Sequence, residues 1–130
     1  MTIDHIGYAV KRLDRAKRAF EDLGYRFERE IEDPDRNVLL QFGEKDGLRI
    51  ELVAPLLKTA PSPVDAYLGK IGPTPYHICY RTDDLEGEIE ALGRKGFRVT
   101  VAPAPAVAFR GRRVVFLMNL GLGLIELVEN

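Results

Sequence analysis

The chain has 130 residues, of which 45% are hydrophobic and 30% are charged, and its formal net charge is −1. This balance is typical of a globular protein, and it gives no overall electrostatic attraction to nucleic acid or to a membrane surface. No apolar run approaches the roughly 20 residues of a membrane-spanning helix, and the opening MTIDHIGYAV does not resemble a signal peptide. The single cysteine, Cys79, cannot form an internal disulfide, so we expect a cytoplasmic protein.

The two halves of the chain repeat each other. At a shift of 72 residues, His5-Ile6-Gly7-Tyr8 falls on His77-Ile78-Cys79-Tyr80. At a shift of 75, the tetrapeptide IELV occurs twice, at Ile50–Val53 and at Ile125–Val128. An internal repeat determines the architecture, so we expect one structural domain made of two equivalent modules, residues 1–55 and 75–130, joined by the linker 56–74.

The first module begins with a β-branched segment, continues with apolar residues at helical spacing up to Gly24, and ends with three more strand-like segments. Its expected elements are a strand at Ile3–Val10, a helix at Leu13–Leu23, and strands at Tyr25–Ile31, Val38–Phe42 and Leu48–Val53. Turns are expected at Asp33-Pro34-Asp35 and at Lys45-Asp46-Gly47. In the linker, Ser62-Pro63 predicts the start of a short helix that reaches Leu68.

The second module repeats this order. Its expected elements are a strand at Tyr76–Thr82, a helix at Leu85–Lys95, and strands at Phe97–Val101, Arg113–Met118 and Leu124–Val128. Asp84 is the expected N-cap of the helix, and Gly96 ends it. The sequence therefore predicts an α+β fold of two βαβββ modules.

Each module carries one histidine on its first strand and one glutamate on its last strand: His5 and Glu51, then His77 and Glu126. If these strands are neighbours, each pair projects from one sheet face, and pseudo-symmetry brings the two pairs together. Two nitrogen and two oxygen donors suit a divalent transition metal with open positions for water or substrate. The structural alternative is a hydrogen-bonded histidine and a solvent-facing glutamate in each module.

The duplicated pattern of histidine and glutamate resembles the glyoxalase, or vicinal oxygen chelate, superfamily over nearly the whole chain. The segments that carry the resemblance are Asp4–Gly7, Ile50–Pro55, Tyr76–Tyr80 and Leu124–Val128. The resemblance implies an eight-stranded, cleft-forming β arrangement around one divalent ion, with His5, Glu51, His77 and Glu126 as its ligands. Cobalt, manganese, nickel, zinc and iron are all acceptable to such ligands.

Within the superfamily, Pro75–Val99 and Gly121–Leu127 are most similar to methylmalonyl-CoA epimerases. This resemblance implies an isomerase that removes the proton next to a thioester carbonyl through a metal-stabilised enolate. Glu126 is the expected acid–base group, and it also binds the metal. The opposing acid is expected in the loop that contains Glu32, Asp33 and Asp35.

Three other activities stay open. Glu51 is closer to the glyoxalase I enzymes, since epimerases often have glutamine at this ligand position, and it supports a lactoylglutathione lyase. A non-catalytic ligand-binding or resistance protein and a dioxygenase occur in the same superfamily. For the epimerase and for each of these alternatives we expect a small-molecule substrate or ligand. In the case of the epimerase, we expect an acyl-CoA thioester. We expect a homodimer, and neither nucleic acid nor membrane as a partner.

Several further residues have a structural and a functional interpretation. Arg110, Arg112 and Arg113 are suited to a phosphate or carboxylate of the substrate, although a solvated loop is the explanation we favour. Tyr8 and Tyr80 alternate with the histidines and are expected in the core. Cys79 is expected to be a small apolar filler.

Overall fold

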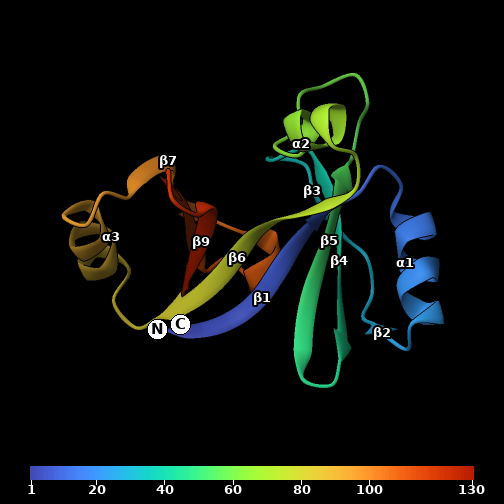
Figure 1. The fold of residues 1–130 in the computed structure, drawn as a ribbon, viewed down its shortest axis with the longest axis horizontal. Helices are drawn as coiled ribbons and strands as arrows, with labels where there is room; N and C mark the ends of the chain where they lie inside the picture. Colours follow the sequence, from blue (N-terminus) through green and yellow to red (C-terminus); the bar gives the residue numbers. More distant parts are fainter. The chain divides into compact units, whose positions relative to one another are not determined.

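The computed structural model describes all residues from Met1 to Asn130 and confirms a mixed α+β fold (Figure 1). The chain divides into two compact units. We call His5–Tyr76 the N-terminal unit, and His77–Asn130 together with Met1–Asp4 the C-terminal unit. None of the helices is long and apolar enough to cross a membrane.

The strands of the first half follow the order β2-β4-β5-β1, and β3 also pairs with β4. β1 runs parallel to β5, whereas β4 is antiparallel to β5, β2 and β3. The elements are β1 (Thr2–Ala9), α1 (Leu13–Asp22), β2 (Arg26–Phe27), β3 (Ile31–Asp33), β4 (Val38–Lys45), β5 (Leu48–Pro55) and α2 (Asp65–Lys70).

The single strand predicted over Tyr25–Ile31 is wrong, because it is interrupted between β2 and β3. The buried side chain of Gln41 explains the interruption, since its Nε2 donates to the carbonyl of Glu28 at 2.6 Å. A side chain thereby occupies a carbonyl that would otherwise serve a strand partner. The structure consequently has nine strands where the sequence predicts eight.

The hairpin between β4 and β5 fixes which residues face each other. Lys45 pairs with Leu48, so the loop is the predicted turn at Asp46-Gly47, and both residues have positive φ (51° and 81°). Two consecutive positive φ angles define the tight hairpin turn that suits an Asp-Gly pair. The register that follows places Phe42 opposite Glu51.

The second half repeats the arrangement in the order β6-β9-β8-β7, with β6 parallel to β9 and β8 antiparallel to both of its neighbours. Asp84 caps α3 as predicted, because its Oδ1 accepts from the Gly87 amide at 3.0 Å. The elements are β6 (Thr74–Thr82), α3 (Leu85–Gly93), β7 (Arg98–Pro105), the 3-10 turn η1 (Val107–Phe109), β8 (Arg113–Asn119) and β9 (Gly123–Glu129).

Each unit packs the isoleucine and the leucine of its IELV strand in a core that includes a residue of its helix. In the N-terminal unit, Ile50 and Leu52 pack in one cluster with Leu13 of α1, and Tyr8 lies against it. In the C-terminal unit, Ile125 and Leu127 pack with Leu85 of α3, and Tyr80 lies against that cluster. Full burial of such a side chain stabilises the fold by roughly 1.5–3 kcal/mol. Because strand side chains alternate, the glutamate of each IELV must point to the opposite face.

Candidate metal centre

The parallel pairing of β1 and β5 brings His5 and Glu51 together on that opposite face. Gly7 is the partner of Glu51 in the register, so His5 lies two residues before it on the same face of β1. His5 Nε2 is 3.4 Å from Glu51 Oε1, and the two residues are 1% and 5% exposed. The ring of Phe42 packs against the His5 ring edge to face, at 5.4 Å between centroids and 77° between planes.

The C-terminal unit has the same arrangement on β6 and β9. Cys79 is the partner of Glu126 in the register, and His77 lies two residues before it. His77 Nε2 is 2.9 Å from Glu126 Oε2, and both side chains are buried. Phe116 packs against His77 at 5.5 Å and 87°. Both modules therefore repeat a histidine, a phenylalanine and a glutamate in one geometry.

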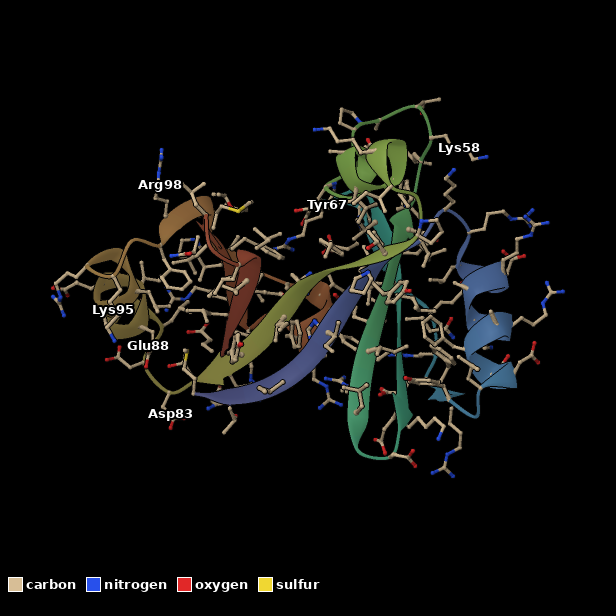
Figure 2. All side chains as sticks on the ribbon, in the orientation of Figure 1. Lys58, Tyr67, Asp83, Glu88, Lys95 and Arg98 are labelled. Carbon is tan, nitrogen blue, oxygen red and sulfur yellow. The ribbon has the colours of Figure 1, made fainter.

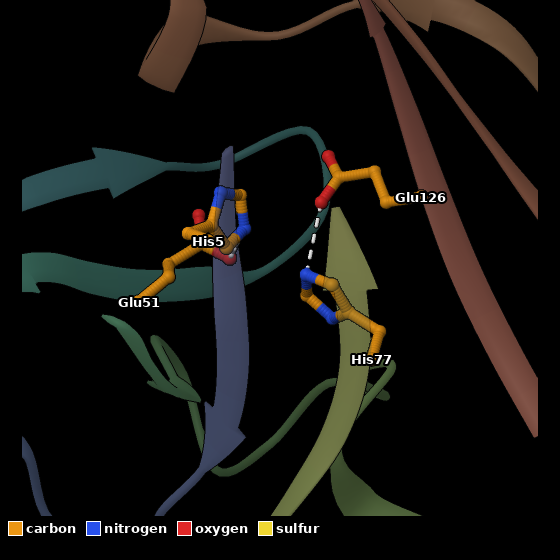
Figure 3. A group of neighbouring side chains, drawn as sticks. All are labelled: His5, Glu51, His77 and Glu126. Atoms are coloured by element: carbon orange, nitrogen blue, oxygen red, sulfur yellow. Dashed lines mark ion pairs between the residues drawn. The ribbon is translucent and has the colours of Figure 1, made fainter. Parts of the chain in front are cut away.

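Figure 3 shows each histidine beside the glutamate of its own module. The solvent-facing alternative for the two glutamates is wrong, because both are buried. A carboxylate is costly to bury unless it is paired or coordinates a metal. Imidazole nitrogen and carboxylate oxygen are the donors that zinc, cobalt, nickel, manganese and iron accept, so the donor set fits such an ion. The structure thus contains a possible His/Glu metal site.

Arg49, which the sequence analysis did not single out, contacts the phenylalanine beside His5. It lies on β5 two residues before Glu51, and its guanidinium carbon is 3.9 Å from the centroid of the Phe42 ring. The available signal was its spacing from Glu51, since residues two apart on a strand share a face. Figure 2 shows that the long side chains of Lys58 and Arg98 extend away from the ribbon.

The loop that was expected to provide the opposing acid is occupied by a local ion pair. Asp33 is buried and accepts from the Arg36 guanidinium at 3.0 Å and from the Arg36 amide at 3.2 Å. Glu32 and Asp35 are exposed. The Asp33 carboxylate therefore has a structural role in the turn that leads to β4.

The three arginines considered in the sequence analysis, Arg110, Arg112 and Arg113, differ in their contacts. Arg113 Nη2 lies 2.7 Å from Glu86 Oε1 and 3.0 Å from Glu129 Oε1, so its guanidinium links α3 to β9. This bonding holds the pKa of the Glu129 carboxyl below its usual value, with the Arg113 side-chain hydrogen bond as the largest cause. Arg110 and Arg112 are exposed, as expected for a solvated loop. Cys79 is fully buried on the same strand face as His77.

A groove of about 540 Å³ lies on the other face of β1, away from His5. It is formed between β1 and α1, and Lys11, Arg12 and Arg15 line it next to apolar side chains such as Phe20 and Leu23. Tyr8 and Val10, which alternate with His5, also line it. The groove is therefore separate from the His5–Glu51 pair.

Comparison with known proteins agrees with the fold. The chain belongs to the glyoxalase/bleomycin resistance protein/dioxygenase superfamily, whose family pattern matches residues 4–116. Among curated proteins it is similar to ethylmalonyl-CoA/methylmalonyl-CoA epimerase of Cereibacter sphaeroides, with 30% identity over 118 residues that cover 88% of this chain and 86% of that protein.

Two solved structures extend the comparison. Methylmalonyl-CoA epimerase from Mycobacterium tuberculosis matches with a TM-score of 0.83 and 30% identity, covering 98% of this chain and 87% of that one. A variant of the Streptomyces coelicolor methylmalonyl-CoA epimerase, in complex with 2-nitronate-propionyl-CoA, matches with a TM-score of 0.82 and 26% identity, covering 100% and 97%. The resemblance predicted from the sequence is confirmed at the level of the superfamily.

Proposed function

We propose that this protein is a divalent-metal-dependent isomerase that epimerises a 2-substituted malonyl-CoA thioester. The observation that carries the proposal is the buried pair of histidine and glutamate, present once in each module at 3.4 Å and 2.9 Å. The similar epimerases indicate the substrate class, and one of them was solved with an acyl-CoA analogue bound. The superfamily alone would also allow a lyase, a dioxygenase or a binding protein.

In this proposal, His5, Glu51, His77 and Glu126 together hold one divalent ion. When bound, such an ion supplies Lewis-acid catalysis at the carbonyl oxygen and so makes the adjacent C–H bond more acidic. The two imidazoles bind through Nε2, the nitrogen that in each module faces the glutamate. The donors accept several divalent ions, so the sequence and the site do not select one of them.

Glu126 is the group we assign to take the proton from the carbon between the two carbonyl groups. Inversion requires that a proton return to the opposite side of that carbon, which calls for a second acid. The buried carboxyl groups of the chain are Asp33, Glu51 and Glu126. Since Asp33 is bonded to Arg36, we assign the second proton transfer to Glu51.

Deuterium exchange tests this function directly. The metal-loaded protein is incubated with methylmalonyl-CoA in D2O, and mass spectrometry follows the deuterium at C2. We expect one deuterium to be incorporated faster than in a control with chelator, and Glu126→Gln to abolish the difference. Exchange equal to the chelator control would remove this substrate from consideration, and metal binding without exchange would favour a binding protein.

A lactoylglutathione lyase is the second candidate, because Glu51 supplies a carboxylate at the ligand position where epimerases often have glutamine. The same acid–base step would then act on a hemithioacetal of glutathione. Loss of the methylglyoxal–glutathione adduct, followed by ultraviolet absorbance, checks it. Turnover of this adduct with no exchange on methylmalonyl-CoA would reverse the order of the two candidates.

We also propose that the protein forms a homodimer. β7 ends the strand order of the C-terminal unit, and its Val99 and Val101 are 45% and 49% exposed. Exposed apolar residues on an edge strand favour pairing with another chain. Light scattering coupled to gel filtration should give twice the mass of 14.6 kDa, and a monomer at all concentrations would contradict the proposal.

A further inference from the structure

We infer that the groove between β1 and α1 binds an anionic amphiphile, a small molecule with an apolar chain and a carboxylate at one end. The groove lies on the face of β1 opposite His5, so the inference goes beyond the proposed function. It assigns a class of ligand to a surface that the proposed reaction does not use.

Most of the groove wall is apolar, and one stripe of α1 supplies much of it. Ala16, Ala19 and Leu23 line the groove at a spacing of three and four residues, and Leu23 at the end of the helix is 65% exposed. Phe20 also lines the groove, and its ring packs on that of Tyr8 at 5.2 Å between centroids. The volume of about 540 Å³ lies within the range of roughly 300–1,000 Å³ that is typical of small-molecule sites.

The end of the groove at the start of α1 is positively charged. Lys11, Arg12 and Arg15 line it, and no acidic residue does. Asp14 is the acid of the first helical turn, and it accepts a hydrogen bond from Arg12 Nη2 at 3.1 Å. Three cations against one carboxylate leave an excess of positive charge, which attracts an anion to this end of the groove.

This charge is unfavourable for the helix that carries it. Cations near the N-terminal end of a helix oppose its dipole. Arg12 is the N-cap residue of α1, and its side chain makes no capping hydrogen bond, whereas serine, threonine, asparagine and aspartate are preferred there. A sequence that departs from such local preferences does so most often at a functional site.

The C-terminal module shows that the fold does not require these residues. Its helix α3 begins with acidic residues where α1 begins with cations, and it ends near a lysine where α1 ends on a leucine. At the shift of 72, the positions of Lys11, Arg12, Arg15 and Leu23 are occupied by Asp83, Asp84, Gly87 and Lys95. Both helices nevertheless pack a leucine, Leu13 or Leu85, into the core of their unit. The cations and the exposed leucine are therefore features of one module, and a ligand explains them better than folding does.

The two parts of the groove together define the ligand. A carboxylate fits the charged end, because the planar fork of a guanidinium matches its two oxygens. An alkyl chain fits the apolar wall, and each methylene that is fully buried strengthens binding roughly fourfold. Lys11 and Arg15 are exposed, so salt screens their attraction, and the affinity for a charged amphiphile should fall as the ionic strength rises.

Calorimetric titration tests the inference with octanoate, octan-1-ol and acetate. Octan-1-ol has the chain without the charge, and acetate has the charge without the chain. We expect octanoate to bind at least about tenfold more tightly than either, and the double substitution Lys11→Gln and Arg15→Gln to remove its advantage over octan-1-ol, since one charged hydrogen bond accounts for about tenfold. Leu23→Ser should weaken octanoate and octan-1-ol by a similar factor. Arg18→Gln, which changes an exposed arginine of α1 outside the groove, is the matched control and should bind as the wild type.

Several results would overturn the assignment. Octan-1-ol that binds as tightly as octanoate, or an equal loss of octanoate binding in Arg18→Gln, would show that the cations of the groove do not recognise the ligand. An affinity for octanoate that changes on addition of cobalt would place the carboxylate at the histidine–glutamate pairs instead. Absence of octanoate binding would also overturn it, and a dimer that dissociates in Leu23→Lys would then assign the groove to a second copy of the chain. Failure of the proposed isomerase reaction leaves this test unaffected, because octanoate binding needs neither the metal ion nor a thioester.

Discussion

The two modules are alike where a metal would bind and different two residues away. In both, a buried histidine packs edge to face on a phenylalanine and lies within 3.4 Å of a buried glutamate. The position two residues before the glutamate is Arg49 in one module and Leu124 in the other. The duplication therefore kept the histidine, the phenylalanine and the glutamate, whereas the residue two positions before the glutamate differs.

A second difference concerns the contacts that hold the strands and helices of each unit together. Where the C-terminal unit pairs Arg113 with Glu129 across β8 and β9, the N-terminal unit has the apolar pair Leu39 and Ala54 across β4 and β5. Arg113 also bonds Glu86 of α3, so the ion pair ties its own helix to the sheet. The ion pairs of Arg113 thus hold elements of the C-terminal unit together, whereas the equivalent positions on β4 and β5 are apolar.

The largest effect on folding is expected at the repeated phenylalanine. Phe42 is 1% exposed and Phe116 is half-buried. Phe42→Ala should lower the free energy of unfolding by about 3–5 kcal/mol, through lost burial and a cavity, and Phe116→Ala by less. Urea denaturation measures both. Phe42→Leu, which keeps most of the volume, is the control and should cost less than about 1.5 kcal/mol. Equal losses at Phe42 and Phe116 would show that burial does not distinguish the two positions.

The next largest effect on stability is expected at Asn37, which lies in the N-terminal unit. Its Nδ2 donates to the carbonyls of Leu57 and Ala60 at 3.0 Å and 2.9 Å, and its Oδ1 accepts from the Leu57 amide at 2.8 Å. Asn37→Gly should cost about 2–4 kcal/mol because three hydrogen bonds between the Asn37 side chain and the backbone of the linker are lost. Asn37→Ala should cost about 1 kcal/mol more, since Asn37 has a φ of 55°. A variant with glycine as stable as the wild type would disprove the role of the side chain.

The N-terminal ends of α1 and α3 differ in capping, and we expect smaller effects on stability there, of opposite sign in the two helices. Asp84 caps α3 with its side chain, whereas Arg12 at the start of α1 makes no such bond. Asp84→Ala should lower the free energy of unfolding by about 1 kcal/mol, and Arg12→Ser should raise it by several tenths of a kcal/mol or more. Thermal melts of the two variants, compared with the wild type, test both signs. The comparison fails if the change at Arg12 destabilises the protein.

The smallest effect is the pH dependence of the Arg113–Glu129 pair. The folded pKa of Glu129 is lowered from its ordinary value of 4.5, chiefly because the Arg113 side chain donates to it. The stabilisation is therefore present above the ordinary pKa and is lost as the pH falls through the lowered folded value. The difference in Tm between wild type and Glu129→Gln should be larger at pH 7 than at pH 3. A difference that stays constant with pH would exclude this linkage.

Much of the fold followed from local patterns in the sequence. The two IELV strands, the Asp-Gly turn and the Asp84 cap each depend on a few neighbouring residues. The periodicity of apolar residues and the preferences of turn and cap residues therefore predict them. The break between β2 and β3 depends on Gln41, thirteen residues after the carbonyl that it binds, and no local pattern reports such a contact. Alternation alone favours solvent-facing acids at Glu51 and Glu126, so only the duplicated pairing with a histidine and the family resemblance favoured a different role for them. The contact of Arg49 with Phe42 could not be predicted either, because it depends on the neighbouring strand.

The central claim is that both histidine–glutamate pairs serve one cation, and metal stoichiometry tests it most directly. The protein is dialysed against cobalt, and bound metal per chain is measured for the wild type, His5→Ala and His77→Ala. We predict one ion per chain, with its affinity reduced at least about 100-fold by either substitution, beyond the effect of losing a residue that only supports a ligand. Two ions per chain, each lost with only one of the histidines, or no bound ion in the wild type, would contradict the account.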